Sequence, residues 1–176
     1  MMLLNKKLPA LLICSTLTGS LLFGCSTTSD NVDTLMKGEL LRNGQFTNGF
    51  DGWWATGAEL NVKDTEGCIN ITTAGSKPWD VILGQGGFGL IKGMSYTLEF
   101  TARANVDTKF NAVIQHEGAP YTNYFSKEIS VSSKSAPFTL TFTHQESSDP
   151  KTDFQLQFGA QKIANVCVRN LSLKSN

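Results

Sequence analysis

Residues 77–121 read KPWDVILGQGGFGLIKGMSYTLEFTARANVDTKFNAVIQHEGAPY. Within this segment, apolar and polar side chains alternate over residues 96–103. Because successive side chains of a strand point to opposite faces, a period of two predicts a strand with one buried and one exposed face. The segment therefore predicts β-structure, and it contains no residue pattern suited to bond-breaking chemistry. The apolar set is Tyr96, Leu98, Phe100 and Ala102, and the polar set is Thr97, Glu99, Thr101 and Arg103.

The same two-residue period recurs through the rest of the chain. It covers residues 110–115, 138–143 and 154–159, and Val166, Val168 and Leu171 indicate a closing strand. Many short strands, with no amphipathic helical stretch after residue 38, predict an all-β fold: a two-sheet antiparallel β-sandwich, or jelly roll. The turn signals that separate the strands are Asn43-Gly44, Asn48-Gly49, Gly86-Gly87, Lys92-Gly93 and Ser148-Asp149-Pro150.

The first 25 residues have the features of a secretory signal. Lys6 and Lys7 precede an apolar run over residues 8–23, which is too short for a good membrane span. The run ends in Leu22-Phe23-Gly24-Cys25, which resembles the bacterial lipobox, so we expect Cys25 to carry a lipid anchor. Ser26, which follows this cysteine, resembles the residue that directs bacterial lipoproteins to the outer membrane. The alternative is an ordinary signal peptide with an incidental cysteine.

The remaining chain divides into a linker and one domain. Residues 26–38 are polar and aperiodic, which is typical of a flexible linker, and residues 39–176 are long enough to form a single core. Without Lys6 and Lys7, 13 basic residues face 15 acidic ones, a formal net charge of −2. No basic run is present, so we expect no nucleic-acid partner and consider an uncharged polysaccharide compatible with this charge.

Four cysteines constrain the redox chemistry. Cys14 leaves with the signal and Cys25 takes the lipid, so Cys68 and Cys167 remain as a pair in an exported domain and predict a disulfide. Such a bridge closes a loop of roughly 100 residues and stabilises the fold by about 4–5 kcal/mol in the chain-entropy model. A metal site is the alternative, but it needs more soft or imidazole ligands than His116 and His144 supply.

Five segments, in order, carry a resemblance to a known family: LLRNGQFTNGFDGW, WDVILGQGGFGLIKGMSYTLEFTARA, QHEGAPYTNYF, FQLQFGA and VCVRNLSL. Together they resemble the carbohydrate-binding modules of families 4 and 9, the cellulase C cellulose-binding type with a galactose-binding-domain-like jelly roll. The resemblance covers about residues 39–174. It implies a concave sheet face that forms a groove for a glycan chain, and a non-catalytic module of the kind usually attached to glycoside hydrolases.

Aromatic side chains are the first candidates for sugar contact, because a flat apolar ring fits the CH face of a pyranose. Trp53 and Trp54 must point to opposite faces of a strand. The resemblance favours a core role for Trp53 and a groove role for Trp54, although Trp54 could also cover the sandwich edge. It implies that Trp79 is the main stacking platform and that Tyr121 is the second groove aromatic, whereas Tyr124 could pack under the loop.

Amide side chains are the second candidates, since each offers donors and an acceptor without a charge to desolvate. The resemblance implies hydrogen bonds to sugar from Asn111 and Gln157. Gln115 and Gln155 share the polar faces of the same strands, so sugar contact and a solvated strand face are both open for them. Gln85 resembles a recurrent glutamine of the family, and it could also be structural.

Two further expectations concern chemistry that the chain lacks. Arg169 stands where many family members place a calcium-binding Asp, so we expect no cofactor and no structural calcium, although Glu39 could contribute a ligand. Glycoside hydrolysis needs two carboxylates across a scissile bond, but the carboxylates available occupy turn-like or edge positions. We therefore predict a binding module rather than an enzyme. These carboxylates are Glu117, Glu146, Asp149 and Asp153.

The sequence hypothesis is a surface-anchored lipoprotein that holds a β-linked polysaccharide, of the xylan or β-glucan type, for separate glycoside hydrolases. We expect it on the bacterial outer membrane, with membrane contact through the lipid anchor only. The competing hypothesis is a structural or adhesion role, in which the sandwich packs against another envelope protein. An open groove lined by exposed aromatics favours the first hypothesis, and a filled groove or a flat apolar patch favours the second.

Overall fold

A computed structural model describes residues 36–176 of the chain. The predicted signal segment with Cys25, and residues 26–35 of the predicted linker, lie outside the described residues. In the described part, no helix is both long enough and apolar enough to cross a membrane. The elements are β1 (Trp54–Thr56), β2 (Glu59–Lys63), β3 (Glu66–Asn70), the 3-10 helix η1 (Pro78–Asp80), β4 (Ile82–Leu90), β5 (Ser95–Ala104), β6 (Thr108–His116), β7 (Asn123–Val131), β8 (Ala136–Thr143), β9 (Asp149–Gln157) and β10 (Asn165–Ser175).

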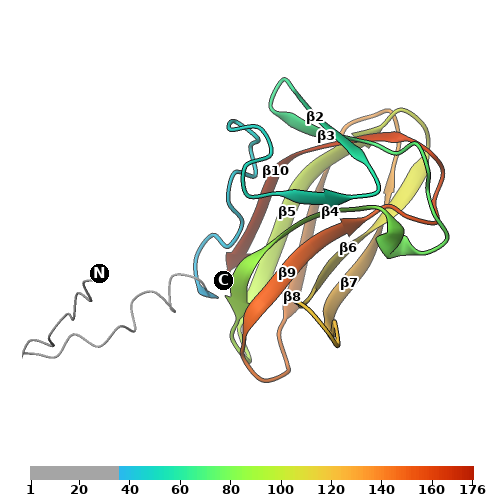
Figure 1. Ribbon diagram of the computed structural model, residues 1–176. Coiled ribbons are helices and arrows are strands. Elements are labelled where there is room, and N and C mark those ends of the chain that lie inside the picture. Colours follow the sequence, from blue (N-terminus) through green and yellow to red (C-terminus); the bar gives the residue numbers. More distant parts are fainter. Residues whose placement is uncertain (1–35) are drawn as a thin grey trace, which may run out of the picture.

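The strands form two packed antiparallel sheets (Figure 1). The first sheet has the order β1-β4-β9-β6-β7, and the second has the order β2-β3-β10-β5-β8. Neighbours in each sheet come from distant parts of the chain, because β4 pairs with β9 and β5 pairs with β10. The prediction of an all-β, two-sheet jelly roll is confirmed.

The core lies between the sheets and follows the predicted alternation. In β5, Tyr96, Leu98, Phe100 and Ala102 are all buried, while Glu99 is exposed. Rings from the two sheets meet across the interior: the centroids of Phe100 and Phe110 are 6.2 Å apart. Burying one such large apolar side chain contributes about 1.5–3 kcal/mol relative to leaving it in water. The alternation therefore decides which face of each strand belongs to the core.

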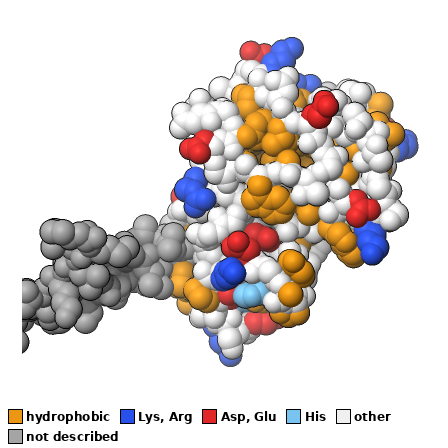
Figure 2. All heavy atoms as spheres, in the orientation of Figure 1, with side chains coloured by type: hydrophobic (Ala, Val, Ile, Leu, Met, Phe, Trp, Pro, Cys, Tyr) orange, Lys and Arg blue, Asp and Glu red, His pale blue; other side chains and the backbone are white. Residues whose placement is uncertain are grey.

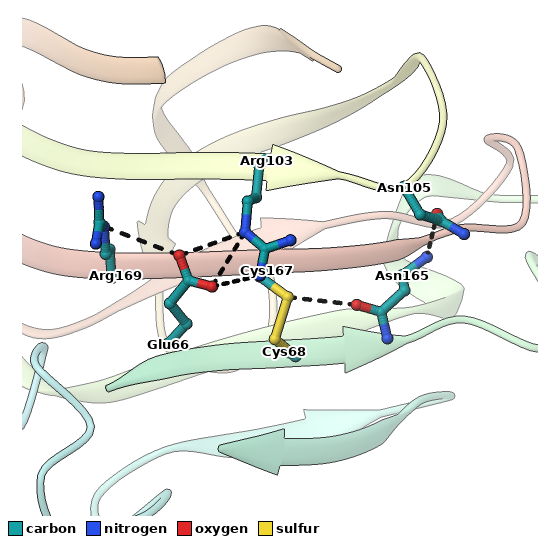
Figure 3. The surroundings of a disulfide bond; sticks show 7 residues. All are labelled: Glu66, Cys68, Arg103, Asn105, Asn165, Cys167 and Arg169. Atoms are coloured by element: carbon teal, nitrogen blue, oxygen red, sulfur yellow. Dashed lines mark hydrogen bonds and ion pairs between the residues drawn. A yellow bond between two sulfur atoms is a disulfide. The ribbon is translucent and has the colours of Figure 1, made fainter. Parts of the chain in front are cut away.

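The predicted disulfide is confirmed. Cys68 of β3 and Cys167 of β10 lie directly opposite each other in the second sheet, with their Cα atoms 4.0 Å apart, and join residues 99 positions apart in sequence (Figure 3). Beside them the Arg103 guanidinium donates to the Glu66 carboxylate at 2.6 Å. The bridge and the ion pair connect β3, β10 and β5 on the outward face of this sheet.

One predicted turn is wrong. Gly86-Gly87 does not separate strands but lies inside β4, where the pairing register with β9 shifts between Gly86 and Phe88. Gly87 has φ 84°, a left-handed conformation that glycine adopts without a Cβ penalty. The physical reason is that a β-bulge and a turn both need a residue that can adopt a left-handed backbone conformation. A Gly-Gly dipeptide therefore does not distinguish a bulge from a turn. Asp149 and Pro150, predicted in a turn, likewise begin β9.

Candidate functional site

A cavity of about 910 Å³ opens on the outward face of the first sheet. Strands β4, β9 and β6 form its floor, and the 3-10 helix η1 and the β6–β7 loop contribute its rim. Figure 2 shows hydrophobic side chains gathered in the middle of the face that carries β4 and β9, with acidic groups and a histidine just below them. The lining residues are Trp54, Trp79, Ile82, Gln115, Glu117, Gly118, Tyr121, Asn123, Asp153, Gln155 and Gln157. We call this cavity the groove.

Three exposed aromatic residues line the groove. Trp54, Trp79 and Tyr121 are 38%, 56% and 59% exposed, which is unusual for side chains of this size. Trp53, in contrast, is buried and donates its indole N–H to the Asn43 carbonyl. The adjacent tryptophans therefore serve opposite faces, with Trp53 in the core and Trp54 in the groove.

Glycine at position 84 allows the Trp54 ring to lie on the sheet. Gly84 is the register partner of Trp54 across β1 and β4. A Cβ added at Gly84 would lie 2.3 Å from the Trp54 ring, closer than real Cβ atoms approach other heavy atoms. The indole therefore packs directly on the glycine backbone and presents its other face to the groove.

A short hydrogen-bonded loop holds Trp79. The Asp80 carboxylate accepts from the backbone N–H groups of Ser76 at 2.7 Å and Lys77 at 2.9 Å. These two hydrogen bonds keep the pKa of Asp80 below its ordinary value. The loop also packs against Gly159. A Cβ at this position would lie 2.0 Å from the Lys77 carbonyl oxygen, so only glycine allows the loop to come this close. Trp79 is thus exposed on a fixed turn.

Tyr121 projects from the β6–β7 loop. Its backbone N–H donates to the Gly118 carbonyl at 2.7 Å, and the His116 N–H donates to the Thr122 carbonyl at 2.9 Å. Tyr121 has φ 57°, a left-handed conformation within this tight turn. The turn therefore aims an exposed phenol ring at the groove from the side opposite β1.

Buried amides form the floor between the aromatics. Gln115, Gln155 and Gln157 all line the groove and are each less than a tenth exposed. The Gln157 amide donates to the Gln155 side-chain oxygen at 2.8 Å, and the Gln155 amide donates to Asp153 Oδ2 at 3.1 Å. This chain of hydrogen bonds fixes the amide orientations along β9. Flat apolar faces over fixed donors and acceptors suit a polyhydroxylated ring.

Asp153 is a buried carboxylate at one end of this floor. Burial raises its pKa to about 6; the hydrogen bond from Gln155 lowers that pKa, the nearby Glu117 charge raises it, and His116 lowers it. Its Oδ1 atom is buried without a hydrogen-bond partner. The prediction that Asp153 occupies a turn-like or edge position is wrong, because β9 is the central strand of its sheet. Asp153 lies on the groove side of β9 with Gln155 and Gln157, two and four residues before them in the same alternation, and this spacing is the sequence signal that places it in the groove.

A second polar cluster lies beside the groove but does not line it. Asp149 Oδ2 lies 2.8 Å from His116 Nδ1 and accepts the Tyr124 hydroxyl at 2.9 Å. Burial alone would raise the pKa of Asp149, but hydrogen bonds from His116, the Lys151 N–H and Tyr124 leave it lowered. Burial and this carboxylate raise the pKa of Tyr124 to about 12. Tyr124 is thus held by Asp149 and by the edge-on His144 ring, 4.7 Å away between centroids, and does not line the groove.

Two predicted groove residues lie elsewhere. Gln85 is completely buried, and its side chain accepts from the Arg42 N–H at 2.6 Å and donates to the Arg42 carbonyl at 2.9 Å. Its assignment to sugar binding is wrong, because both ends of the amide are used to hold the segment before β1. Asn111 is paired with Gln157 in register on the groove side of β6, but it does not line the cavity.

Glu39 does not offer a free carboxylate. Oε1 accepts from the backbone N–H groups of Leu41 and Leu173, and Oε2 accepts from the Ser172 hydroxyl at 2.5 Å. Arg169 lies 3.9 Å from Glu66. Among residues 36–176, the one group of three side chains with metal-ligand spacing is Glu66, Cys68 and Cys167, and the disulfide consumes both sulfurs. The absence of a structural calcium stays a prediction.

Glu117, Asn123, Ile82 and Gly118 line the groove without having been predicted to do so. Glu117 and Gly118 belong to the segment QHEGAPYTNYF, which the sequence places at the groove because of Tyr121. Asn123 is the first residue of β7, and Ile82 is the first residue of β4. Neither strand has a clear alternation of apolar and polar residues, so the sequence did not predict which face these residues occupy. The two groove carboxylates, Glu117 and Asp153, both approach Gly86: a Cβ there would lie 3.0 Å from Glu117 Oε2 and 3.5 Å from Asp153 Cβ. The two carboxylates therefore lie together at one end of the groove. Glycoside hydrolysis instead requires two carboxylates on opposite sides of the scissile bond.

Comparison with known proteins agrees with this geometry. The sequence pattern of a carbohydrate binding domain family, CBM_4_9, matches residues 38–162. Endoglucanase C of Cellulomonas fimi is 27% identical over 152 residues, which are 81% of this chain and 14% of the enzyme. The chain therefore spans about a seventh of that relative's length.

Solved structures share the fold. A structure described as "CBM4 structure and function" superposes with a TM-score of 0.69 at 24% identity, covering 77% of this chain and 99% of the other. The second N-terminal cellulose-binding domain of the Cellulomonas fimi β-1,4-glucanase C gives a TM-score of 0.68 at 23% identity, covering 80% of this chain and 95% of that domain.

Proposed function

Because this chain belongs to the carbohydrate binding domain family, we propose that its groove holds a β-linked polysaccharide, of the xylan or β-glucan type, at the surface of a bacterial cell. The chain is a non-catalytic binding domain. The proposal adds the ligand class and the location. One observation carries it: Trp54, Trp79 and Tyr121 are exposed around a floor of buried amides.

The groove fits a neutral chain of sugar rings. Trp79 and Tyr121 offer flat faces from two different loops, so they can contact sugar units at separate points along one chain. The buried amides between them offer donors and acceptors at fixed positions. Among the described residues that line the groove, the charged ones are Glu117 and Asp153, so the floor offers an anionic polymer no counter-charge. The Lys77 ammonium lies outside the floor, 5.6 Å from the centroid of the Trp79 ring.

The same geometry disfavours the competing adhesion hypothesis. A protein partner is favoured by a flat apolar patch or by a groove filled with side chains. Here the cavity of about 910 Å³ is open, and amide and carboxylate side chains lie on its floor between the aromatic rings. A hollow lined in this way matches the shape of a small-molecule or oligosaccharide site more closely than that of a protein interface.

Affinity gel electrophoresis tests the ligand class. All strands and the core lie within residues 36–176, so a chain that begins at residue 26 retains the folded unit. We expect xylan or a β-glucan in the gel to retard this chain, and Trp79→Ala or Tyr121→Ala to abolish most of the retardation. Loss of one stacking ring should weaken binding by about tenfold or more.

Ile163→Ala is the matched control, because Ile163 is 61% exposed but does not line the groove. It should leave retardation unchanged. Retardation that survives both aromatic substitutions would reject the groove as the binding site, and no retardation by any polysaccharide in the panel would reject the proposed ligand class.

We further propose that Cys25 carries a lipid that anchors the module to the outer membrane, where it serves secreted or surface glycoside hydrolases. The support is the sequence Leu22-Phe23-Gly24-Cys25 and the polar segment that follows. Acyl chains bind membranes at about 0.8 kcal/mol per buried CH₂, so two or more chains give stable anchoring. Cys25→Ala should move the full chain from the membrane fraction to the soluble fraction, and unchanged membrane association would contradict the anchor.

A further inference from the structure

Asp153 lies where three strands of the groove floor meet. It pairs in register with Gly86 of β4 on one side and with Gln115 of β6 on the other. Its side chain lines the groove, yet only 5% of the residue is exposed. Residues on a central strand are held on both sides by the ladder, so this carboxylate has a fixed position relative to the aromatic rim.

The carboxylate is only half satisfied by the protein. Oδ2 accepts the Gln155 amide at 3.1 Å, whereas Oδ1 is buried and has no partner. Buried polar atoms in native proteins are nearly always hydrogen-bonded, and an unpaired one destabilises the fold. Gln155 and Gln157 follow Asp153 on β9: the Gln157 amide donates to Gln155 Oε1, and the Gln155 amide donates to Asp153 Oδ2. Asp153 therefore has an unpaired acceptor atom in a residue that lines the groove, next to the place where a ligand would lie.

The charge around Asp153 is negative and uncompensated within the groove. Glu117 lines the same end, and the two side chains approach Gly86 together. His116, whose charge lowers the pKa of Asp153, has Nδ1 2.8 Å from Asp149 Oδ2, and Arg42 donates to the Gly86 carbonyl at 3.5 Å. Two like charges a few ångströms apart repel strongly where water is partly excluded. A sugar carboxylate placed here would add a third negative charge.

We propose that Asp153 is a specificity-determining residue of the groove: it accepts a hydroxyl of a neutral glycan and, with Glu117, rejects sugars that carry a carboxylate, such as uronic acids. This inference rests on the proposed function and adds a selection rule to it. Charge-assisted hydrogen bonds are stronger than neutral ones, so the ionised residue favours hydroxyl donors. The same negative charge repels acidic polysaccharides that have the same main-chain linkages as the neutral ligand.

A matched pair of polymers tests the rule: a mixed-linkage β-1,3/1,4-glucan and the same glucan oxidised at C6 to glucuronate. The chain from residue 26 should bind the neutral polymer at least tenfold more tightly than the oxidised one, by affinity electrophoresis or calorimetry. Asp153→Asn should weaken binding of the neutral polymer by about tenfold, the loss expected for one charge-assisted hydrogen bond. It should also reduce the preference between the polymers to about threefold or less.

Glu59→Gln supplies the charge-matched control, since Glu59 is exposed on β2 of the other sheet. It should leave both affinities and their ratio unchanged. Equal binding of the two polymers by the unsubstituted chain, or an unchanged ratio in Asp153→Asn, overturns the selection rule alone. Binding of neither polymer by the unsubstituted chain overturns the rule together with the proposed β-glucan ligand.

Discussion

The two outward faces of the sandwich are built from similar alternating strands but treat their polar side chains differently. On the second sheet, polar groups pair with one another: Arg103 with Glu66 at 2.6 Å, and Ser95 with Thr143 at 2.7 Å. On the first sheet, rings are left exposed and Asp153 Oδ1 has no partner. The first sheet also holds internal pairs, such as Lys109 with Glu128 at 2.6 Å, but its groove end combines exposed rings with a buried carboxylate oxygen that has no partner among the described residues. The comparison therefore separates residues that stabilise the fold from residues that bind.

The largest expected effect concerns the second face. Replacing Cys68 and Cys167 together by Ala removes a bridge between residues 99 positions apart. The free energy of unfolding should fall by about 4–5 kcal/mol in the chain-entropy model. Denaturant titration measures this loss, and polysaccharide affinity measured well below the unfolding midpoint should not change. A large drop in affinity of the still folded variant would break the separation between the two faces.

The next effect concerns Asp153 on the first face. Its folded pKa of about 6 lies above the ordinary 3.8, so the folded state binds this proton more tightly than the unfolded state. The contribution of Asp153 to stability therefore falls as pH rises from about 4 to about 6, by about 3 kcal/mol in all. Asp153→Asn should thus be more stable than the unsubstituted chain above pH 6, with the difference vanishing toward pH 4.

Asp149→Asn provides the control of opposite sign. The pKa of Asp149 is lowered in the folded state, so its ionised form stabilises the fold above the ordinary carboxyl pKa, and this contribution is lost as pH falls. The substitution should therefore destabilise at neutral pH. Unfolding free energies of both variants across pH 4–8 check the pair, and a destabilised Asp153→Asn at pH 7 would mean that the carboxylate serves the fold.

The smallest effect is expected for the ion pair on the second face. Glu66→Gln removes the charge that faces Arg103, whose side chain is 39% exposed. Partly exposed ion pairs contribute little, so the unfolding free energy should fall by about 1 kcal/mol or less. Thermal unfolding with Glu59→Gln alongside measures it. A loss of several kcal/mol would show that the network around the disulfide acts as one unit.

Much of the fold follows from local pattern, and the places where prediction failed have identifiable causes. The alternation in β5, β6 and β9 predicts their core faces because apolar side chains of each strand fill the space between the sheets. On the groove face, Gln115 of β6 and Gln155 and Gln157 of β9 are buried as well, and the alternation does not predict that. The two strands β1 and β2 are short and largely exposed, so they carry no such contrast. The Gly86-Gly87 bulge resembles a turn in sequence, since both need the same backbone freedom.

The candidate site was predicted in part for similar reasons. Trp54, Trp79, Tyr121 and Gln157 line one groove, as the family resemblance implied. Gln115 and Gln155, for which the sequence left sugar contact and a solvated strand face both open, line it too. Gln85 failed because sequence shows that a glutamine is polar but not that Arg42 occupies both ends of its amide. Asp153 and Glu117 were considered only as catalytic acids, and their approach to Gly86 arises from strand pairing that no local pattern reveals.

The three tryptophans offer the most direct test, because each gives one indole N–H signal in a ¹H–¹⁵N NMR spectrum and one of them lies in the core. On titration with a mixed-linkage β-glucan oligosaccharide, the signals of Trp54 and Trp79 should shift progressively while that of Trp53 stays in place. If Trp54 and Trp79 do not shift while backbone signals of the second sheet do, the ligand binds elsewhere, and the account of the groove is contradicted.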